Sequence, residues 1–328
     1  MKQILQYLLN HNTLSKAEAK AILTEIAQNK FNENEVTAFV TVFLMRSITL
    51  EEMEGFQEAL LRLSVTVDLG TEDLVDIVGT GGDGKDTFNI STLASFVVAG
   101  TGQKVAKHGN YGVSSISGSS NVLEELGYQF KTSSEDLRSD LSKGNICFLH
   151  APLFHPALRS VAPLRKGLGL RTFFNILGPL VNPAKPKFSM IGVYSLEIAR
   201  IYQYLLQKKN ENFLLVHALD GYDEISLTSD TKIFDKSGEH IFSAQELGFK
   251  NISAESIFGG NTKQDAAEIF KSVLEGNGTY EQNSVVLANA AMALKNTEKY
   301  GDYSDCLALA VESLESGKAL RSLQNIIN

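Results

Sequence analysis

The spacing of apolar residues divides the chain into two parts that meet near residue 66. In the first part, apolar residues recur every three or four positions, which predicts amphipathic helices and little strand. Ser15 and Glu18 fit a capping box, in which two side chains satisfy backbone amides at a helix start. The predicted helices run through Ala27 after that box, from about Asn32 to at least Leu44, and from Thr49 towards Leu63. We interpret their apolar faces as the core of a small bundle, with a dimerisation surface as the alternative.

From Leu74 onward, short apolar runs that suit strands alternate with helical patterns, which is typical of an α/β sheet. The predicted strands are 75–78, 105–108, 146–149, 188–193 and 213–218, with an antiparallel extension at 232–234 and 240–242. The predicted helices are 91–101, 119–126, 134–142, 156–167, 196–208, 263–274, 284–297 and 303–315. We therefore expect a small N-terminal all-helical domain, residues 1–65, and a larger α/β domain, residues 66–328, with a mostly parallel central sheet flanked by helices.

Composition narrows the class of protein. The 328 residues contain 43% hydrophobic and 21% charged residues, which is typical of a soluble globular chain. The net charge of −8 argues against a general nucleic-acid or membrane surface. Both cysteines, Cys147 and Cys306, lie in apolar runs and are expected to be buried reduced thiols. The N-terminal residues lack a signal-peptide cleavage site, and no apolar run approaches the ~18 residues of a membrane span, so we expect a cytoplasmic protein.

The stretch from Ile77 to Ser95 carries the strongest chemical signal. A strand-like run ends in Gly79-Thr80-Gly81-Gly82-Asp83-Gly84, so four of six residues are glycine. Glycine permits positive φ and a close approach of backbone N–H groups to a ligand. The following residues Asn89, Ser91 and Thr92 can cap a helix whose positive end attracts anions. Together these features predict a phosphate cradle, and a simple tight turn is the alternative.

A nucleoside-triphosphate loop fits this stretch less well. Residues Gly79 to Lys85 satisfy the first seven positions of that motif, but Asp86 stands where a magnesium-binding hydroxyl is required. The predicted helix also begins later than the motif demands. We keep this class as a weak rival.

Two further segments place polar residues after predicted strands. Lys107, His108 and Asn110 end one strand, where ligands bind in open α/β sheets, and Lys supplies a cation for phosphate. The Ser/Gly-rich segment 113–127 follows, and it either binds a second anionic group or caps a helix through Ser119 or Ser120. Its candidate donors are Ser115, Gly118, Ser119 and Ser120.

Charged residues later in the chain add two candidates. Arg165 lies near the end of the helix predicted after His155 and Pro156, where it either complements the helix dipole or forks onto a carboxylate. Asp223 and Glu224 follow the predicted strand 213–218. An isolated acidic turn is usually only solvated, but beside a phosphate cradle adjacent carboxylates favour magnesium.

Taken together, these segments resemble the anthranilate phosphoribosyltransferase family. The similarity covers essentially the whole chain. The matching segments are GTGGD (79–83), NIST (89–92), KHGN (107–110), SGSSNVLEELG (117–127), HP (155–156), RKGLGLRTFFNILGPLVNP (165–183) and DGYDE (220–224). Related nucleoside phosphorylases share GTGGD, whereas the 165–183 run is much more specific.

The resemblance implies transfer of phosphoribose from 5-phosphoribosyl 1-pyrophosphate (PRPP) to anthranilate, by a homodimer joined through its helical domains. It implies no general base, no nucleic-acid partner and no membrane partner. The implied PRPP-binding residues are Gly79, Gly81, Gly82, Asp83, Thr87, Asn89, Ser91, Thr92, Lys107 and Ser119. The implied anthranilate-binding residues are Gly79, His108, Asn110, His155 and Arg165. Ser91, Asp223 and Glu224 are the implied ligands of Mg²⁺, with two ions per subunit.

Two positions depart from the family pattern. Many members carry Arg after KHGN and Asp in the serine segment, where this chain has Tyr111 and Asn121. A nucleoside phosphorylase and a non-catalytic nucleic-acid-binding relative are the alternatives, although the Asp223-Glu224 pair and the acidic composition argue against the latter.

Overall fold

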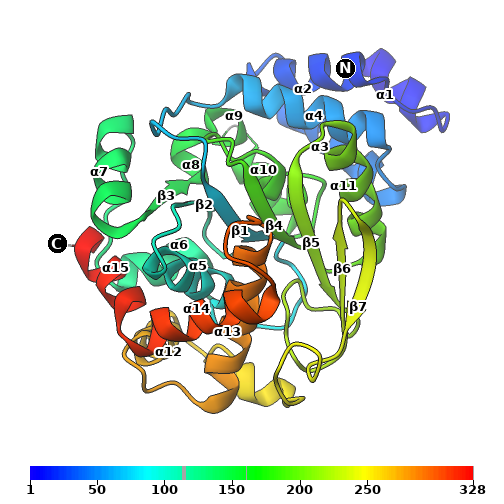
Figure 1. The fold of residues 1–328 in the computed structure, drawn as a ribbon. Helices are drawn as coiled ribbons and strands as arrows, with labels where there is room; N and C mark the ends of the chain where they lie inside the picture. Colours follow the sequence, from blue (N-terminus) through cyan, green and yellow to red (C-terminus); the bar gives the residue numbers. More distant parts are fainter. Residues whose placement is uncertain (113–115, 160, 328) are drawn as a thin grey trace. The chain divides into compact units, whose positions relative to one another are not determined.

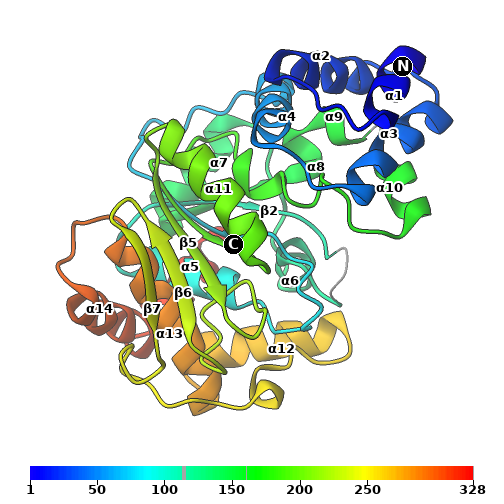
Figure 2. The same ribbon diagram turned by 90° about the vertical axis from the view of Figure 1, so that its right-hand side faces the viewer.

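The computed structural model describes residues 1–112, 116–159 and 161–327 (Figures 1 and 2). The chain forms two compact units. A helical unit contains Met1–Thr66 and Ala151–Pro183, and an α/β unit contains Val67–His150 and Ala184–Asn328.

The N-terminal part of the helical unit follows the sequence prediction. Its helices are α1 (Lys2–Leu9), α2 (Lys16–Ala27), α3 (Glu33–Met45) and α4 (Leu50–Leu63). Ser15 and Glu18 form the predicted capping box, and Asn32 and Thr49 begin α3 and α4 with the same motif. Each cap satisfies amides that have no partner inside the helix, so the three helix starts are fixed by local sequence.

The helical unit also takes in residues 151–183, which differs from the predicted assignment of 66–328 to a single α/β domain. Packing explains the difference. The ring of Phe173 stacks on Phe56 at 4.6 Å and meets Phe39 and Phe43 edge-on. Gln57 donates a 2.8 Å hydrogen bond to the backbone carbonyl of Leu180. The apolar faces of α3 and α4 therefore bury a segment that is distant in sequence.

This segment is less regular than predicted. Instead of one helix over 156–167, the structure contains α8 (Ala151–Phe154), α9 (Pro156–Arg159) and α10 (Ala162–Leu168), followed by a 3₁₀ turn, η1 (Gly178–Leu180). Pro163 lies in the first turn of α10, where its missing N–H costs nothing, but the same residue cannot sit inside a continuous helix. The prediction of one helix was wrong for this reason.

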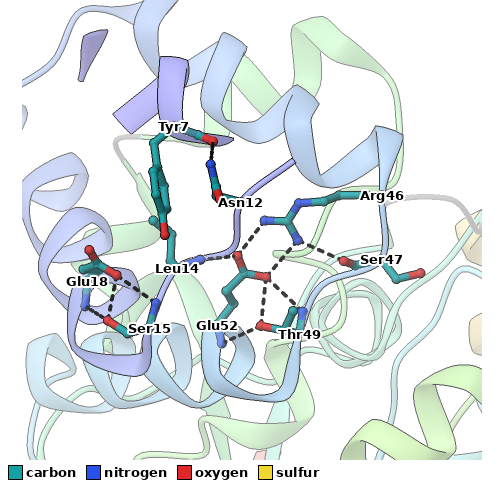
Figure 3. Close-up of polar contacts among 9 residues, drawn as sticks. All are labelled: Tyr7, Asn12, Leu14, Ser15, Glu18, Arg46, Ser47, Thr49 and Glu52. Atoms are coloured by element: carbon teal, nitrogen blue, oxygen red, sulfur yellow. Dashed lines mark hydrogen bonds and ion pairs between the residues drawn. The ribbon is translucent and has the colours of Figure 1, made fainter. Parts of the chain in front are cut away.

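A buried carboxylate joins three elements of the helical unit (Figure 3). Glu52 is fully buried and accepts hydrogen bonds from both terminal nitrogens of Arg46, at 2.6 and 2.9 Å. It also accepts from the backbone N–H groups of Leu14 and Thr49, each at 2.9 Å, and from the Thr49 hydroxyl. Burial opposes ionisation, but these hydrogen bonds outweigh it and lower the pKa of Glu52.

The α/β unit is built on a seven-stranded sheet in the order β3-β2-β1-β4-β5-β6-β7 (Figure 1). The first five strands of this order are parallel, and β6 and β7 are antiparallel, as predicted. The bounds are β1 (Val75–Gly79), β2 (Val105–Gly109), β3 (Ile146–His150), β4 (Phe188–Gly192), β5 (Asn212–Ala218), β6 (Thr231–Asp235) and β7 (Gly238–Phe242).

The strand order reverses direction between β1 and β4. From β1 the chain passes through α5 (Ile90–Gly100) to β2 on one side, and from β4 through α11 (Leu196–Lys208) to β5 on the other. Right-handed crossovers in opposite directions place these two helices on opposite faces of the sheet. Such a switch point leaves a crevice at the carboxyl ends of the strands, where ligands bind in open α/β sheets. Gly79 and Gly192 pair at this edge.

The remaining helices cover the sheet and bury its apolar core. They are α6 (Ser119–Glu125), α7 (Ser134–Gly144), η2 (Ala254–Ile257), α12 (Lys263–Leu274), α13 (Tyr280–Lys295), α14 (Tyr303–Glu315) and α15 (Lys318–Ile327). The sequence analysis did not predict α15, which packs on α5 and α7. Cys147 and Cys306 are buried free thiols, as expected. Across the described residues, no helix combines the length and apolarity that a membrane span requires.

Candidate functional site

The glycine loop leaves β1 in the conformation that its sequence predicts. Gly81, Gly82 and Gly84 have φ of 63°, 77° and 73°, values that other residues rarely adopt. Asp86 also has a positive φ, of 49°, and its carbonyl accepts a 2.8 Å hydrogen bond from the Gly259 amide. The chain therefore turns at Asp86, and α5 begins only at Ile90. This geometry contradicts the nucleoside-triphosphate loop, which requires the helix to begin at Lys85.

The acidic segment 220–224 contacts this loop directly. The Gly81 N–H donates a 2.7 Å hydrogen bond to Asp223 Oδ2, and the Thr87 hydroxyl donates a 2.9 Å hydrogen bond to Glu224 Oε1. The Lys85 ammonium lies 4.6 Å from the centre of the Tyr222 ring, a cation–π distance. Two segments separated by 142 positions thus form one site at the switch point.

Two glycines at the ends of β1 and β4 leave room for the acidic segment. A Cβ atom on Gly79 would lie 2.4 Å from Asp223 Oδ2, and one on Gly192 would lie 1.6 Å from the Asp223 carbonyl oxygen. The backbone clash at position 192 therefore requires glycine, and a side chain at position 79 would displace the Asp223 carboxylate. Gly192 was not among the predicted site residues, although a glycine near the end of a predicted strand was the available signal.

The carboxylates of this site repel one another. Burial, and then the charge of Asp83, raises the pKa of Asp223 to about 7. Burial and the charges of Asp223 and Asp83 likewise raise the pKa of Glu224, and no described residue forms a hydrogen bond with the buried Oε2 of Glu224. A hard divalent cation with oxygen ligands would relieve both effects.

The protein supplies only part of a metal's coordination sphere. Within the described ranges, no three side chains among His, Cys, Asp and Glu are grouped so that they could hold an ion by themselves. Mg²⁺ is commonly bound by one or two carboxylates together with substrate phosphates, so Asp223 and Glu224 fit an ion that is shared with a phosphorylated ligand. The third predicted metal ligand, Ser91, accepts a 3.4 Å hydrogen bond at its Oγ from Lys107 Nζ.

Lys107 provides a buried cation below the glycine loop. Its side chain is 2% exposed, and its ammonium donates hydrogen bonds to the Ile77 carbonyl and to Ser91 Oγ. Burial lowers the pKa of Lys107 to about 8, against the charges of Asp76 and Glu224, which favour the ammonium form. Lys107 is therefore still mainly protonated at neutral pH. Asp76, which the sequence analysis did not single out, also accepts a hydrogen bond from the His108 N–H.

The segments around Asn110 and Ser119 meet above the end of β2. The Asn110 carbonyl accepts hydrogen bonds from Ser119 Oγ at 3.3 Å and from Ser120 N–H at 3.1 Å. Neither serine caps α6, because Gly118 occupies the N-cap position. Ser115 lies outside the described residues.

The side chains of three predicted binding residues, Asn89, Thr92 and His108, are not exposed donors in the structure. Asn89 occupies the N-cap position of α5, but its side chain makes no capping bond and instead donates to the Ser117 carbonyl at 3.0 Å. Thr92 and His108 are almost fully buried, so neither presents an exposed side chain.

The helical unit carries the other two acceptor candidates. Arg165 lies in the last turn of α10, partly buried, with its guanidinium 5.6 Å from the centre of the Phe174 ring. Burial lowers its pKa, and within the part of the chain that the structure describes no carboxylate pairs with it. His155 is completely buried, and burial lowers its pKa to about 4, although the backbones of Val181 and Leu60 act in the opposite direction. Arg165 is thus a partly buried cation that pairs with no carboxylate among the described residues, whereas His155 is a neutral core residue.

Family models match both parts of the chain. A model described as "Glycosyl transferase family, a/b domain" matches residues 71–320, and one described as "Glycosyl transferase family, helical bundle domain" matches residues 2–64.

Relatives of known name extend over nearly the whole chain. An anthranilate phosphoribosyltransferase from Flavobacterium johnsoniae is 52% identical over 326 residues, which cover 99% of this chain and 98% of the relative. One from Bacteroides fragilis is 51% identical over 327 residues, with coverage of 100% and 99%. Among solved structures, anthranilate phosphoribosyltransferase from Saccharomyces cerevisiae in complex with PRPP and Mg superposes with a TM-score of 0.91 at 29% identity, over 98% of this chain and 95% of that one. The same enzyme in complex with 4-fluoroanthranilate gives a TM-score of 0.87 at 28% identity, with the same coverage.

Proposed function

Since the chain belongs to the anthranilate phosphoribosyltransferase family, we propose that it transfers the phosphoribosyl group of PRPP to the amino group of anthranilate and releases pyrophosphate. It is a pentosyltransferase of tryptophan biosynthesis. The observation that carries the proposal is the contact between Gly81 and Asp223, which joins a phosphate cradle to a carboxylate pair in one crevice.

The α/β unit binds the donor in this proposal. The glycine loop with Gly79, Gly81 and Gly82 cradles the phosphates, because its lack of side chains lets the backbone come close to them, and the Lys107 ammonium offsets their negative charge. Asp83, Thr87 and Asn89 shape the loop around the sugar and pyrophosphate. Ser91 and Ser119 add hydroxyl donors, while buried Thr92 fixes the first turn of α5.

Asp223 and Glu224 would hold magnesium, with Ser91 in support, and the ion would neutralise charge on the pyrophosphate. Two ions per subunit fit the several negative charges of the donor and the shortage of protein ligands noted above. When bound, Mg²⁺ stabilises the negative charge that develops on the departing pyrophosphate. The protein's own contribution is to fix the carboxylates against the glycine loop before the substrate arrives.

Arg165 binds the carboxylate of anthranilate, and Gly79, His108 and Asn110 border the acceptor on the α/β unit. Because His155 is buried and neutral, its role is to support the short helices that carry Arg165. In the reaction, the bond between the ribose carbon and pyrophosphate breaks, and its electron pair leaves with pyrophosphate. The lone pair of the amine forms the new C–N bond, and the nitrogen then releases a proton to solvent. An arylamine is unprotonated at neutral pH, so orientation replaces a general base.

A homodimer joined through the helical units and a cytoplasmic location complete the proposal. Exposed apolar side chains on these helices, Leu9 at 68% and Met45 at 82%, favour a covered surface. Two free thiols agree with a reducing compartment. Light scattering of the purified chain tests the dimer, and a monomeric mass at micromolar concentration contradicts it.

Loss of anthranilate fluorescence in the presence of PRPP and Mg²⁺ tests the activity. The expected result is a loss that requires both. Unchanged fluorescence at saturating PRPP, with ribose 1-phosphate released from a nucleoside and phosphate, would establish phosphorolysis instead. Salt-sensitive retention on DNA without transferase activity would establish a nucleic-acid-binding protein.

A further inference from the structure

Tyr111, the first position that departs from the family pattern, makes a set of contacts that the proposed function does not use. Its hydroxyl donates a 2.6 Å hydrogen bond to Glu124 Oε1 on α6. Its ring meets the His150 ring edge-on, with centres 4.7 Å apart and planes at 77°. The hydrogen bond to Glu124 raises the pKa of Tyr111 to about 12, so the phenol stays protonated and remains a donor.

His150 is itself held on two sides. Phe130 stacks on its ring at 4.5 Å, and its Nδ1 lies 2.8 Å from Ser120 Oγ. The imidazole is buried, and burial lowers its pKa, so it is neutral at pH 7. Two contacts therefore hold the Tyr111 side chain: its hydroxyl bonds to Glu124 on α6, and its ring packs against His150 at the end of β3.

The backbone next to Tyr111 meets the start of α6 at a loop neck, and Asn110 directly precedes Tyr111 on one side of this neck. Asn121 Oδ1 accepts from the N–H groups of Gly112 and Gly118, at 2.9 and 3.0 Å. The two sides of the neck touch, since a Cβ on Gly118 would lie 2.2 Å from the Gly112 nitrogen. The Tyr111 N–H donates a 2.8 Å hydrogen bond to Asn110 Oδ1, which sets the orientation of the Asn110 amide.

We infer that Tyr111 is a positioning residue for the acceptor: by clamping the loop neck to α6 and β3, it fixes the amide of Asn110 in the orientation that meets anthranilate. The inference rests on the proposed function, which places Asn110 beside the acceptor. It assigns a role to the side chain at which this sequence departs from the family pattern. It also separates the two substrates, because the contacts of the Tyr111 side chain with described residues are to Glu124 and His150, and not to the glycine loop, Lys107 or the acidic pair.

The test compares KM values for the two substrates. We expect Tyr111→Ala to raise the anthranilate KM about tenfold and to leave the PRPP KM and kcat within about twofold, because only the acceptor is misoriented. Tyr111→Phe keeps the ring contact and loses the hydrogen bond, so a rise of about threefold is expected. Glu124→Gln retains an acceptor oxygen and should resemble the wild type, whereas Glu124→Ala should match Tyr111→Phe and add nothing to it in the double variant.

Two controls separate the possible failures. Tyr204→Ala removes an exposed tyrosine from α11 and should change neither KM. Asn110→Ala tests the proposed placement of Asn110 beside the acceptor and should raise the anthranilate KM; the activity itself is tested by the fluorescence assay above. A normal anthranilate KM in Tyr111→Ala, with a raised one in Asn110→Ala, overturns the inference alone. A normal KM in Asn110→Ala overturns both that placement and the inference. Equal rises of both KM values together with a lowered Tm in Tyr111→Ala show a merely structural role and also overturn the inference.

Discussion

The two units bury carboxylates in opposite ways. In the helical unit, Glu52 is surrounded by five hydrogen bonds from Arg46, Leu14 and Thr49, and its pKa is lowered. In the α/β unit, Asp223 and Glu224 face each other and Asp83, and the pKa values of both are raised. A satisfied buried charge fixes a fold, whereas an unsatisfied one is kept for a ligand that is not part of the chain.

The largest effect is expected from leaving the satisfied charge without its partner. Arg46→Met removes the guanidinium and strands Glu52 in the core, which should lower the free energy of unfolding by about 3–5 kcal/mol. Calorimetry measures the loss. Lys318→Ala is the matched control, since it breaks the exposed pair with Glu312 and should cost at most about 0.5 kcal/mol. Equal losses in the two variants would contradict the contrast between the units.

At Asp223, whose pKa is raised, we expect a substitution to lower activity without lowering stability. Asp223→Asn should reduce kcat/KM about 100-fold or more, because a magnesium ligand is lost. The Tm without Mg²⁺ should stay the same or rise, since one source of repulsion is removed. A large fall in Tm would show that Asp223 is mainly structural.

Arg165 tests whether the helical unit is purely structural. Arg165→Ala should raise the anthranilate KM about tenfold and leave the Tm unchanged within about 2 °C, because no described carboxylate pairs with Arg165 as Glu52 pairs with Arg46. The exposed neighbour Lys166→Ala serves as the control. A KM that is the same in both variants would remove Arg165 from the acceptor site.

The smallest effect concerns pH. Because the pKa of Glu52 is lower in the folded chain than in the unfolded chain, its stabilisation is present above the unfolded value of about 4.3 and is lost as pH falls through the folded pKa. Glu52→Gln should therefore flatten the decline in Tm below about pH 4.3, relative to the wild type. Parallel Tm profiles over pH 2–5 would contradict the lowered pKa.

Local patterns predicted much of the fold. Capping boxes fixed the starts of α2, α3 and α4, and alternating apolar runs located every strand of the sheet to within one or two residues. The membership of residues 151–183 in the helical unit was not predictable, because it depends on the packing of Phe173 against aromatic rings far away in sequence.

The candidate site shows the same contrast between local sequence signals and contacts from distant segments. The glycine loop, Lys107 and the acidic pair were identified because each carries a chemical signal in its own residues. The clearance at Gly192, the burial of His155 and the neck formed by Asn121 could not be read from the sequence, because each is a property of neighbours contributed by other segments.

The divided origin of the helical unit bears on how the chain is made. During synthesis, α1 to α4 leave the ribosome first. Their partners follow more than a hundred residues later: Phe173 packs on the aromatic rings of α3 and α4, and the Leu180 carbonyl accepts the hydrogen bond from Gln57. The apolar surface of the N-terminal helices therefore stays exposed until the chain has been translated past β1, β2 and β3. A fragment that stops at Thr66 would lack these partners, so the boundary suggested by the hydrophobic pattern is a poor place to cut this protein.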